Sequence, residues 1–102
     1  MEINAHCHNQ VLHIRLQGEI DEYSAARARR TADELAEKYA SCKSAVFDLK
    51  DISFMDSTGI GFLIGRYKKF KKLGIPTYVA NPTPSTDKIL AISGIYTLIP
   101  KL

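Results

Sequence analysis

A chain of 102 residues is long enough to bury one hydrophobic core but too short to build two lobes around a large cofactor, so we expect a single domain spanning residues 1–102. Its hydrophobic fraction of 45% and charged fraction of 25% are those of an ordinary globular protein, and no apolar run is long enough to cross a bilayer. The net charge of +3 is too small to predict a nucleic-acid-binding protein by itself.

The largest group of basic side chains falls on the second half of one predicted helix. Its members are Arg66, Lys68, Lys69, Lys71 and Lys72. Cations near a helix C-terminus interact favourably with the helix dipole, and no aromatic-rich nucleic-acid motif accompanies them. We therefore interpret the group as a solvated helix face and expect neither a nucleic acid nor a membrane as a partner.

The first ten residues have neither a basic start nor an apolar stretch, so the sequence favours a cytoplasmic location. Cys7 falls in the first predicted strand and Cys42 in a loop. Because disulfides are rare in reducing compartments, we expect two free thiols. His6 and His8 flank Cys7, but strand alternation places them on the face opposite the thiol, and no further ligand is evident. We therefore predict no metal site.

Two β-prone runs begin the chain. They cover residues 3–7 and 11–17, and the polar tripeptide HNQ between them favours a hairpin. After the polar piece EIDEYS, apolar residues at helical spacing predict a helix over residues 25–39 with Ser24 as its N-cap. Its apolar stripe consists of Ala28, Ala32, Leu35, Ala36 and Tyr39.

The second half of the chain continues the alternation of strands and helices. SAVFDL at residues 44–49 has the pattern of a short buried strand, and KDISFMD leads from it into a second helix that ends before Gly74. The strand IPTYVA follows, and then a third helix with Pro84 in its first turn and Gly94 at its exit. We expect a last strand over residues 97–99. The apolar stripe of the second helix consists of Ile60, Leu63, Ile64, Tyr67 and Phe70.

This order of elements predicts the fold class. Strands that alternate with helices indicate parallel neighbours joined by crossovers, while the opening hairpin adds an antiparallel edge. We therefore expect an α/β fold with a small mixed β-sheet, an N-terminal antiparallel hairpin and helices packed against the sheet.

The segment SFMDSTGIGFLIGRYKK at residues 53–69 starts the second helix with unusual residues. A glycine in a helix interior costs about 1 kcal/mol relative to alanine. Close packing on the sheet would explain Gly61 and Gly65. Ser57 is expected at or near the N-cap, where free backbone N–H groups at the positive end of the helix can receive an anion. The candidate site consists of Asp56, Ser57, Thr58 and Gly59.

Several kinds of catalytic or nucleotide site fit this segment poorly. A dinucleotide fingerprint G-x-G-x-x-G would need its third glycine one position before Gly65, and the Gly-Lys-Ser/Thr ending of a phosphate-binding NTPase loop does not occur. The nucleophile elbow G-x-S-x-G of a serine hydrolase is absent, and all histidines precede Ser57. We therefore expect no enzymatic activity and no cofactor. A small nucleotide-binding domain stays open as the weaker alternative.

Ser57 could instead be the target of a modification. A phosphate on its hydroxyl would add about −1.5 to −2 charges at neutral pH, directly beside Asp56. A helix N-terminus tolerates such a charge, whereas a docked protein partner with an apolar or acidic surface does not. One hydroxyl could thereby switch an interface without refolding the domain.

Three stretches of the chain resemble the STAS domains of bacterial anti-sigma factor antagonists, especially those that control sporulation or general-stress sigma factors. They are GEID at residues 18–21, LKDISFMDSTGIGFLIGRYK at 49–68 and ISGI at 92–95. The resemblance covers nearly the whole chain, and its central block is specific. Thr58 stands where some members have serine, and the chain ends at Leu102, where many members continue into another helix.

The resemblance implies a role for each candidate residue. In that family the serine directly after the aspartate of D-S-[ST]-G is phosphorylated by an anti-sigma factor that is itself a serine kinase, and that serine corresponds to Ser57. The unphosphorylated form binds the anti-sigma factor and frees the sigma factor, and a metal-dependent serine phosphatase restores this form. The partner-binding residues expected here are Asp21, Asp56, Ser57, Thr58, Gly59 and Ile60. A STAS module within a signalling scaffold is the alternative that shares this fold.

Overall fold

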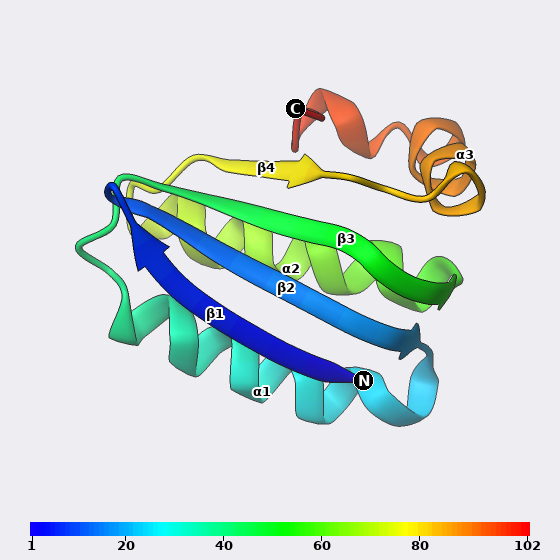
Figure 1. Ribbon diagram of the computed structural model, residues 1–102, viewed down its shortest axis with the longest axis horizontal. Helices are drawn as coiled ribbons and strands as arrows, with labels where there is room; N and C mark the ends of the chain where they lie inside the picture. The colour runs from blue at the N-terminus through cyan, green and yellow to red at the C-terminus, as the bar shows by residue number, and fades with distance from the viewer.

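The computed structural model describes residues 1–102, and helices alternate with strands along the chain after an initial hairpin (Figure 1). The elements are β1 (Glu2–His8), β2 (Val11–Ile20), α1 (Glu22–Lys38), β3 (Ser44–Met55), α2 (Ser57–Lys72), β4 (Thr77–Ala80) and α3 (Pro84–Ser93). A short 3-10 helix, η1 (Ile95–Thr97), follows α3.

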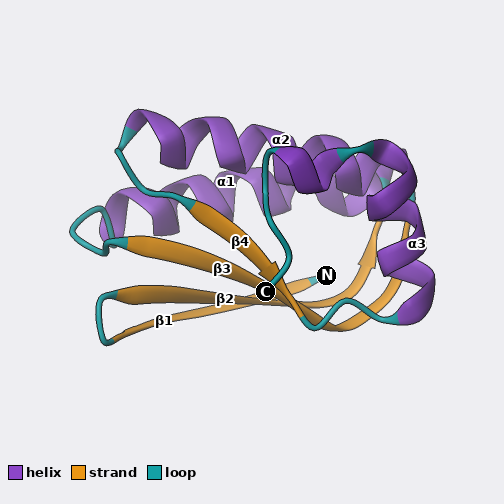
Figure 2. Cartoon of the chain, turned by 90° about the horizontal axis from the view of Figure 1, so that it is seen from above, coloured by secondary structure: helices purple, strands orange, loops and turns teal.

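The four strands form one mixed sheet in the order β1-β2-β3-β4. β1 is antiparallel to β2, whereas β2, β3 and β4 are parallel to one another. Helices α1 and α2 cover one face of the sheet, α3 lies at its end, and no helix covers the other face (Figure 2). The predicted fold class is therefore confirmed. No helix has the length and apolar character needed to span a membrane.

The core lies between the sheet and helices α1 and α2. Side chains of a strand alternate between the two faces, and in β2 the inward Leu12, Ile14 and Leu16 are fully buried, whereas Arg15 is exposed. The ring of Phe47 in β3 packs edge-on against that of Phe70 in α2, with ring centroids 6.1 Å apart. The sheet thus has one apolar face under the helices and a second face that no helix covers (Figure 2).

The hairpin between β1 and β2 forms as the sequence predicts. His8 pairs with Val11, and the two residues between them, Asn9 and Gln10, have φ values of 50° and 66°. Two consecutive residues with positive φ match the right-handed twist of a two-residue hairpin turn, and asparagine accepts that conformation better than most residues.

Helix α1 begins earlier than the sequence predicts. Its N-cap is Asp21, whose Oδ1 accepts hydrogen bonds from the backbone N–H groups of Tyr23 and Ser24, each at 3.1 Å. Ser24 is not the N-cap; its hydroxyl accepts a hydrogen bond from the Asp21 N–H at 3.2 Å, which completes a capping box. Both residue types favour caps, and the end of β2 at Ile20 decides which one is used.

Three strand predictions need correction. β3 continues through the piece expected to be a connector and ends at Met55, because its second half pairs with the end of β2 up to Ile20↔Met55. β4 is shorter than IPTYVA and begins at Thr77. The expected strand over residues 97–99 is absent: η1 ends at Thr97, and only Lys101 forms a bridge, to Val79. Helix α3, with Pro84 first and Gly94 as its left-handed cap, is confirmed.

The closely packed glycine of α2 is Gly59. A Cβ at Gly61 or Gly65 would meet no heavy atom within 4 Å, so close packing on the sheet does not explain these two residues. A Cβ at Gly59 would lie 2.5 Å from Cγ of Met55 and 3.3 Å from Cγ2 of Ile20. The first turn of α2 therefore packs directly on the ends of β2 and β3.

Arg66 does not belong to a solvated helix face. The residue is only 7% exposed, and its Nε lies 2.8 Å from Oδ1 of Asp33 in α1, without the alignment of a hydrogen bond. Its guanidinium group covers the ring of Phe62 at 5.1 Å. Burial lowers the pKa of Arg66, and the charge of Asp33 opposes this effect. Of the other four members of this basic group, Lys68, Lys71 and Lys72 are exposed as predicted, whereas Lys69 is half-buried.

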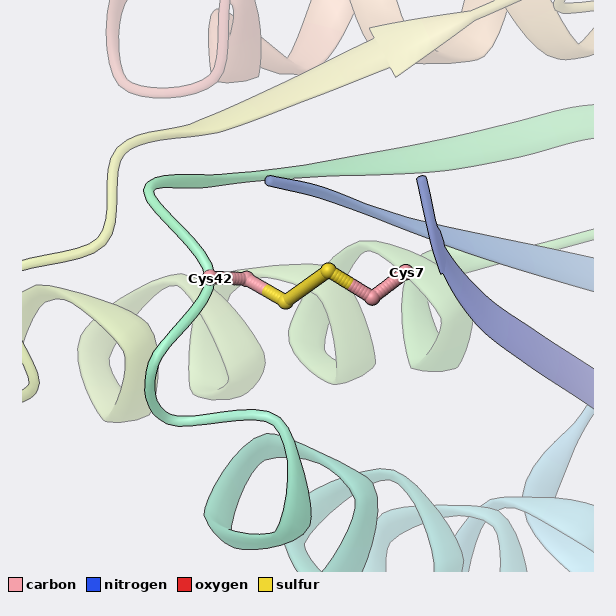
Figure 3. The surroundings of a disulfide bond; sticks show 2 residues. All are labelled: Cys7 and Cys42. Carbon is pink, nitrogen blue, oxygen red and sulfur yellow. A yellow bond between two sulfur atoms is a disulfide. The ribbon is translucent and has the colours of Figure 1, made fainter. Parts of the chain in front are cut away.

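The two cysteines form a disulfide and are not the free thiols expected (Figure 3). Cys7 lies opposite Leu12 in the hairpin, and Leu12 pairs in turn with Ala45, three residues after Cys42. Strand pairing therefore brings the end of β1 next to the loop between α1 and β3, although the cysteines are 35 positions apart in the sequence.

Candidate functional site

The candidate site lies where β2 and β3 end and α1 and α2 begin, at one end of the sheet (Figure 1). Ile20 and Met55 are paired across the two parallel strands, and the next residue in each chain segment is an aspartate. Because neighbouring parallel strands deliver their carboxyl ends to the same edge, Asp21 and Asp56 emerge side by side. The tertiary structure thus brings together two of the residues that the sequence identified separately.

Each aspartate caps the helix that follows it. Asp21 caps α1 as described above, and Oδ1 of Asp56 accepts a hydrogen bond of 2.8 Å from the backbone N–H of Thr58. The Asp56 carbonyl accepts from the N–H of Gly59 at 3.0 Å. These bonds satisfy N–H groups that a helix start would otherwise leave without partners. The backbone around Ser57 is therefore held in a defined turn.

Ser57 is the first residue of α2 and is exposed, whereas the neighbouring Thr58 is half-buried. The prediction that Ser57 lies at or near the helix cap is confirmed, and the cap itself is Asp56. The first turn of α2 contains no acidic side chain. An anion carried by the Ser57 hydroxyl would therefore be attracted by the positive end of the helix dipole. The negative charge of the adjacent Asp56 would repel it.

Gly59 and Ile60 anchor this turn to the core. Gly59 is buried against Met55 and Ile20, the paired residues that precede the two caps. Ile60 is half-buried and packs against the core cluster. Gly59 therefore positions Ser57 by allowing close approach of the helix to the strand ends, and Ile60 offers only part of its surface to a partner.

The structure adds exposed apolar side chains that the sequence reasoning missed. Tyr23, in the first turn of α1, is 96% exposed, and Phe54, near the end of β3 and paired with Glu19, is 48% exposed. Tyr23 lies outside the apolar stripe of its helix, which is a signal that the sequence already contained. Phe54 could not be recognised, because its outward position depends on a register shift between β2 and β3.

An open groove of about 1080 Å³ adjoins the site on the side of α1. It runs between the start of β1 and the first half of α1, and Asp21 and Tyr23 form part of its wall. Its polar lining includes Glu2, Glu19 and Arg27. The site is thus a convex helix start with an open polar groove beside it. Such a surface is better suited to bind a protein partner than to enclose a small molecule.

The side chains at the site can form hydrogen bonds and apolar contacts with a partner. An exposed hydroxyl, two capping carboxylates and two aromatic side chains surround the strand ends. No group of three or more His, Cys, Asp or Glu side chains is placed to hold a metal ion. All three histidines lie in β1 and β2.

Known proteins resemble this chain both in sequence and in fold. A family model described as the STAS domain matches residues 2–102. The chain is 33% identical over 100 residues to an anti-sigma F factor antagonist of Paenibacillus polymyxa, with 98% of this chain and 85% of the relative covered. It is 35% identical over 88 residues to an anti-sigma-B factor antagonist of Bacillus subtilis, with 86% and 78% covered. The solved structure of the anti-sigma factor antagonist SpoIIAA in its unphosphorylated form superposes with a TM-score of 0.77 at 22% identity, covering 99% of this chain and 88% of that one.

Proposed function

The chain belongs to the STAS domain family, and on this premise we propose that it is an anti-sigma factor antagonist controlled by phosphorylation of Ser57. The unphosphorylated form binds an anti-sigma factor that has serine kinase activity, and the sigma factor is released. Phosphate on Ser57 ends this binding, and a metal-dependent serine phosphatase restores it. The domain is a regulatory binding module of the cytoplasm and not an enzyme.

The observation that carries this proposal is the placement of Ser57. Its side chain is exposed at the first position of α2. The backbone N–H of the next residue, Thr58, donates the capping hydrogen bond to Asp56 and so fixes the turn. A kinase can reach the hydroxyl without unfolding the helix. Thr58, the other hydroxyl of the motif, is half-buried and therefore a poorer acceptor.

A phosphate at this position acts on the interface rather than on the fold. An anion at an exposed helix N-terminus stabilises the helix by about 0.3 to 1 kcal/mol, so the domain stays folded. The same charge would have to be desolvated by a partner that covers Tyr23, Phe54 and the start of α2. Binding therefore weakens while the helical content measured by circular dichroism stays the same.

The first experiment maps the modified residue. We expect that incubation with a candidate anti-sigma kinase and ATP places phosphate on Ser57, and that phosphopeptide mapping by mass spectrometry finds it there. Ser57→Ala should accept none, and Thr58→Ala, the matched control, should be modified like the wild type. Phosphate found mainly on Thr58 in the wild-type protein would contradict the proposal.

The second experiment measures binding to the anti-sigma factor. Ser57→Ala should bind like the unmodified wild type and should stay bound in the presence of ATP, because no acceptor is left. Ser57→Asp should bind more weakly, and phosphorylated wild type weaker still, since a carboxylate carries less charge than phosphate. Calorimetric titrations can compare all four proteins. Equal affinities of the phosphorylated and unmodified forms would show that charge at Ser57 does not control the interface.

A capture experiment separates the proposal from its alternatives. Unmodified protein and the phosphorylated form are used as paired baits, and bound proteins are identified by mass spectrometry. Recovery of an anti-sigma kinase by the unmodified bait alone supports the proposal, whereas recovery of a large signalling assembly without such a kinase favours the scaffold module. A direct titration with ATP and GTP tests the nucleotide-binding alternative.

A further inference from the structure

One face of the sheet carries no helix (Figure 2). All three histidines of the chain lie in β1 and β2, whose side chains alternate between this face and the face under the helices. His6 in β1 is paired directly with His13 in β2, and both flanking residues of His13, Leu12 and Ile14, are fully buried under the helices. Because side chains alternate along a strand, His6 and His13 point to the open face. His8, two positions after His6, points the same way.

The two paired imidazole rings are in contact. Their centroids are 5.1 Å apart, and their planes differ by 15°. Directly opposed residues of two antiparallel strands have Cβ atoms about 4.5 to 5.5 Å apart, and the outer torsion of a histidine side chain rotates freely over a broad range. Rotation of the two rings can therefore present one nitrogen of each to a common point above the sheet.

We propose that His6 and His13 chelate a single divalent cation of the nickel, copper and zinc class on this open face. Neutral imidazole is the ligand that these borderline cations prefer, and an imidazole nitrogen lies about 2.0 to 2.1 Å from bound zinc. No third side chain joins the pair in a group able to hold a metal, so water completes the coordination. With two protein ligands on the open face of the sheet, the site would bind and release the cation reversibly.

The neighbouring side chains do not supply the binding. His8 is paired with Val11 near the turn, and its Nε2 lies 3.2 Å from Nδ2 of Asn9. Cys7 lies between the two histidines of β1 in sequence, but it points to the opposite face and is joined to Cys42. His6, Cys7 and His8 are neighbours in the sequence, whereas His13 comes opposite His6 only through the hairpin register.

The cation would stabilise the hairpin. A ligand that binds the folded state alone raises its stability in proportion to the logarithm of the ligand concentration above Kd. The chelate would hold edge strand β1 to β2 at a position remote from Ser57, so it is independent of the proposed phosphorylation switch.

Calorimetric titration of the full chain, without an affinity tag of histidines, with Ni²⁺ as the probe tests the proposal. We expect one cation per chain and a melting temperature that rises with Ni²⁺ concentration. His6→Asn and His13→Asn should each weaken binding at least tenfold, whereas His8→Asn, the matched control, should bind like the wild type. His13→Phe keeps a flat ring beside His6 and should lose the cation without losing stability in its absence.

Two results would overturn the proposal. One is a loss of affinity in His8→Asn as large as that in His13→Asn, which would place the cation elsewhere. The other is unchanged Ni²⁺ binding in His13→Phe, which would show that the paired rings are a stacking contact alone.

Discussion

At the scale of single residues, Gly59 and Gly61 illustrate how neighbouring glycines of one helix differ in purpose. Gly59 lies where any Cβ would collide with Met55 and crowd Ile20, the residues that end β3 and β2. Gly61 is exposed, and a Cβ there would touch nothing within 4 Å. Packing beneath the candidate site requires a glycine at position 59, whereas no contact requires a glycine at position 61.

This difference predicts opposite effects of the same substitution. Gly59→Ala should lower the free energy of unfolding by about 1 to 3 kcal/mol, because the added methyl overpacks a filled contact. Gly61→Ala should raise it by up to about 1 kcal/mol, because alanine favours the helix interior. Urea denaturation of both variants measures these changes. A destabilised Gly61→Ala or a neutral Gly59→Ala would contradict the packing described for this turn.

At the scale of elements, two ion pairs join α1 to α2, and their surroundings differ. Arg66 and Asp33 form the inner pair, in which the arginine is almost completely buried. Lys69 donates a 2.8 Å hydrogen bond to Glu37 at the surface. This bond lowers the pKa of Glu37 and raises that of Lys69, but solvent screens the pair.

Removing the acidic partner should therefore have unequal consequences for stability. Asp33→Ala leaves the buried Arg66 charge without its counter-ion and should cost about 1 to 3 kcal/mol. Glu37→Ala, the matched control on the same helix, should change the unfolding midpoint in urea little. Adding Arg66→Met to Asp33→Ala should restore most of the loss, since an apolar side chain needs no partner. No recovery in the double variant would show that packing over Phe62, rather than the unpaired charge, is the cause.

The C-terminal elements are joined by a second polar cluster. The Tyr96 hydroxyl donates a hydrogen bond of 2.6 Å to Oδ1 of Asp87 in α3, and Nζ of Lys101 donates to the same oxygen at 3.0 Å. The hydrogen bond from Tyr96, and to a smaller extent that from Lys101, holds the pKa of Asp87 below its ordinary value of 3.8. Burial, and then the bond to Asp87, raises the pKa of Tyr96 well above its ordinary value.

The lowered pKa of Asp87 predicts a contribution to acid sensitivity. The unfolded chain takes up a proton at this carboxylate near pH 3.8, before the folded chain does, so this part of the stability is present above that pH and is lost below it. Asp87→Asn should be less stable than the wild type at pH 7. Between pH 4 and pH 3, where the lowered pKa of Asp87 makes the wild type sensitive to acid, the variant should lose less stability than the wild type. Denaturant titrations at both pH values measure the slope. Parallel pH profiles would remove Asp87 as a source of the effect.

At the scale of the whole molecule, the disulfide joins the edge strand of the sheet to the loop before β3, at the end of the sheet remote from Ser57 (Figures 1 and 3). Cross-linking residues 35 positions apart restricts the unfolded chain. Reducing compartments keep cysteines as free thiols, so the stability of the domain depends on its redox environment.

Cys7→Ser should lower the free energy of unfolding by about 2 to 4 kcal/mol in the absence of reductant. With excess dithiothreitol the variant and the wild type should unfold at the same urea concentration, because both then lack the bridge. Alkylation followed by mass spectrometry counts the thiols in each sample. Two free thiols in oxidised wild-type protein, with unchanged stability of Cys7→Ser, would restore the interpretation made from the sequence.

The sequence by itself determined the local features of this protein. The hairpin turn at Asn9 and Gln10, the third helix between Pro84 and Gly94, and the place of Ser57 at a helix start all follow from the residues themselves. Turn preference, capping and apolar periodicity act over a few neighbouring residues, so they can be read without a fold.

Only the tertiary structure decided which distant residues meet. The pairing of Ile20 with Met55 brings Asp21 beside Asp56, and the hairpin register places His13 opposite His6. Tertiary packing likewise buries Arg66, and strand pairing brings Cys7 to Cys42. The expected last strand failed for a related reason: a β-prone run becomes a strand only where a neighbour offers a ladder, and the segment after α3 reaches β4 at one bridge. These outcomes depend on contacts between residues far apart in the sequence, which local propensity does not encode.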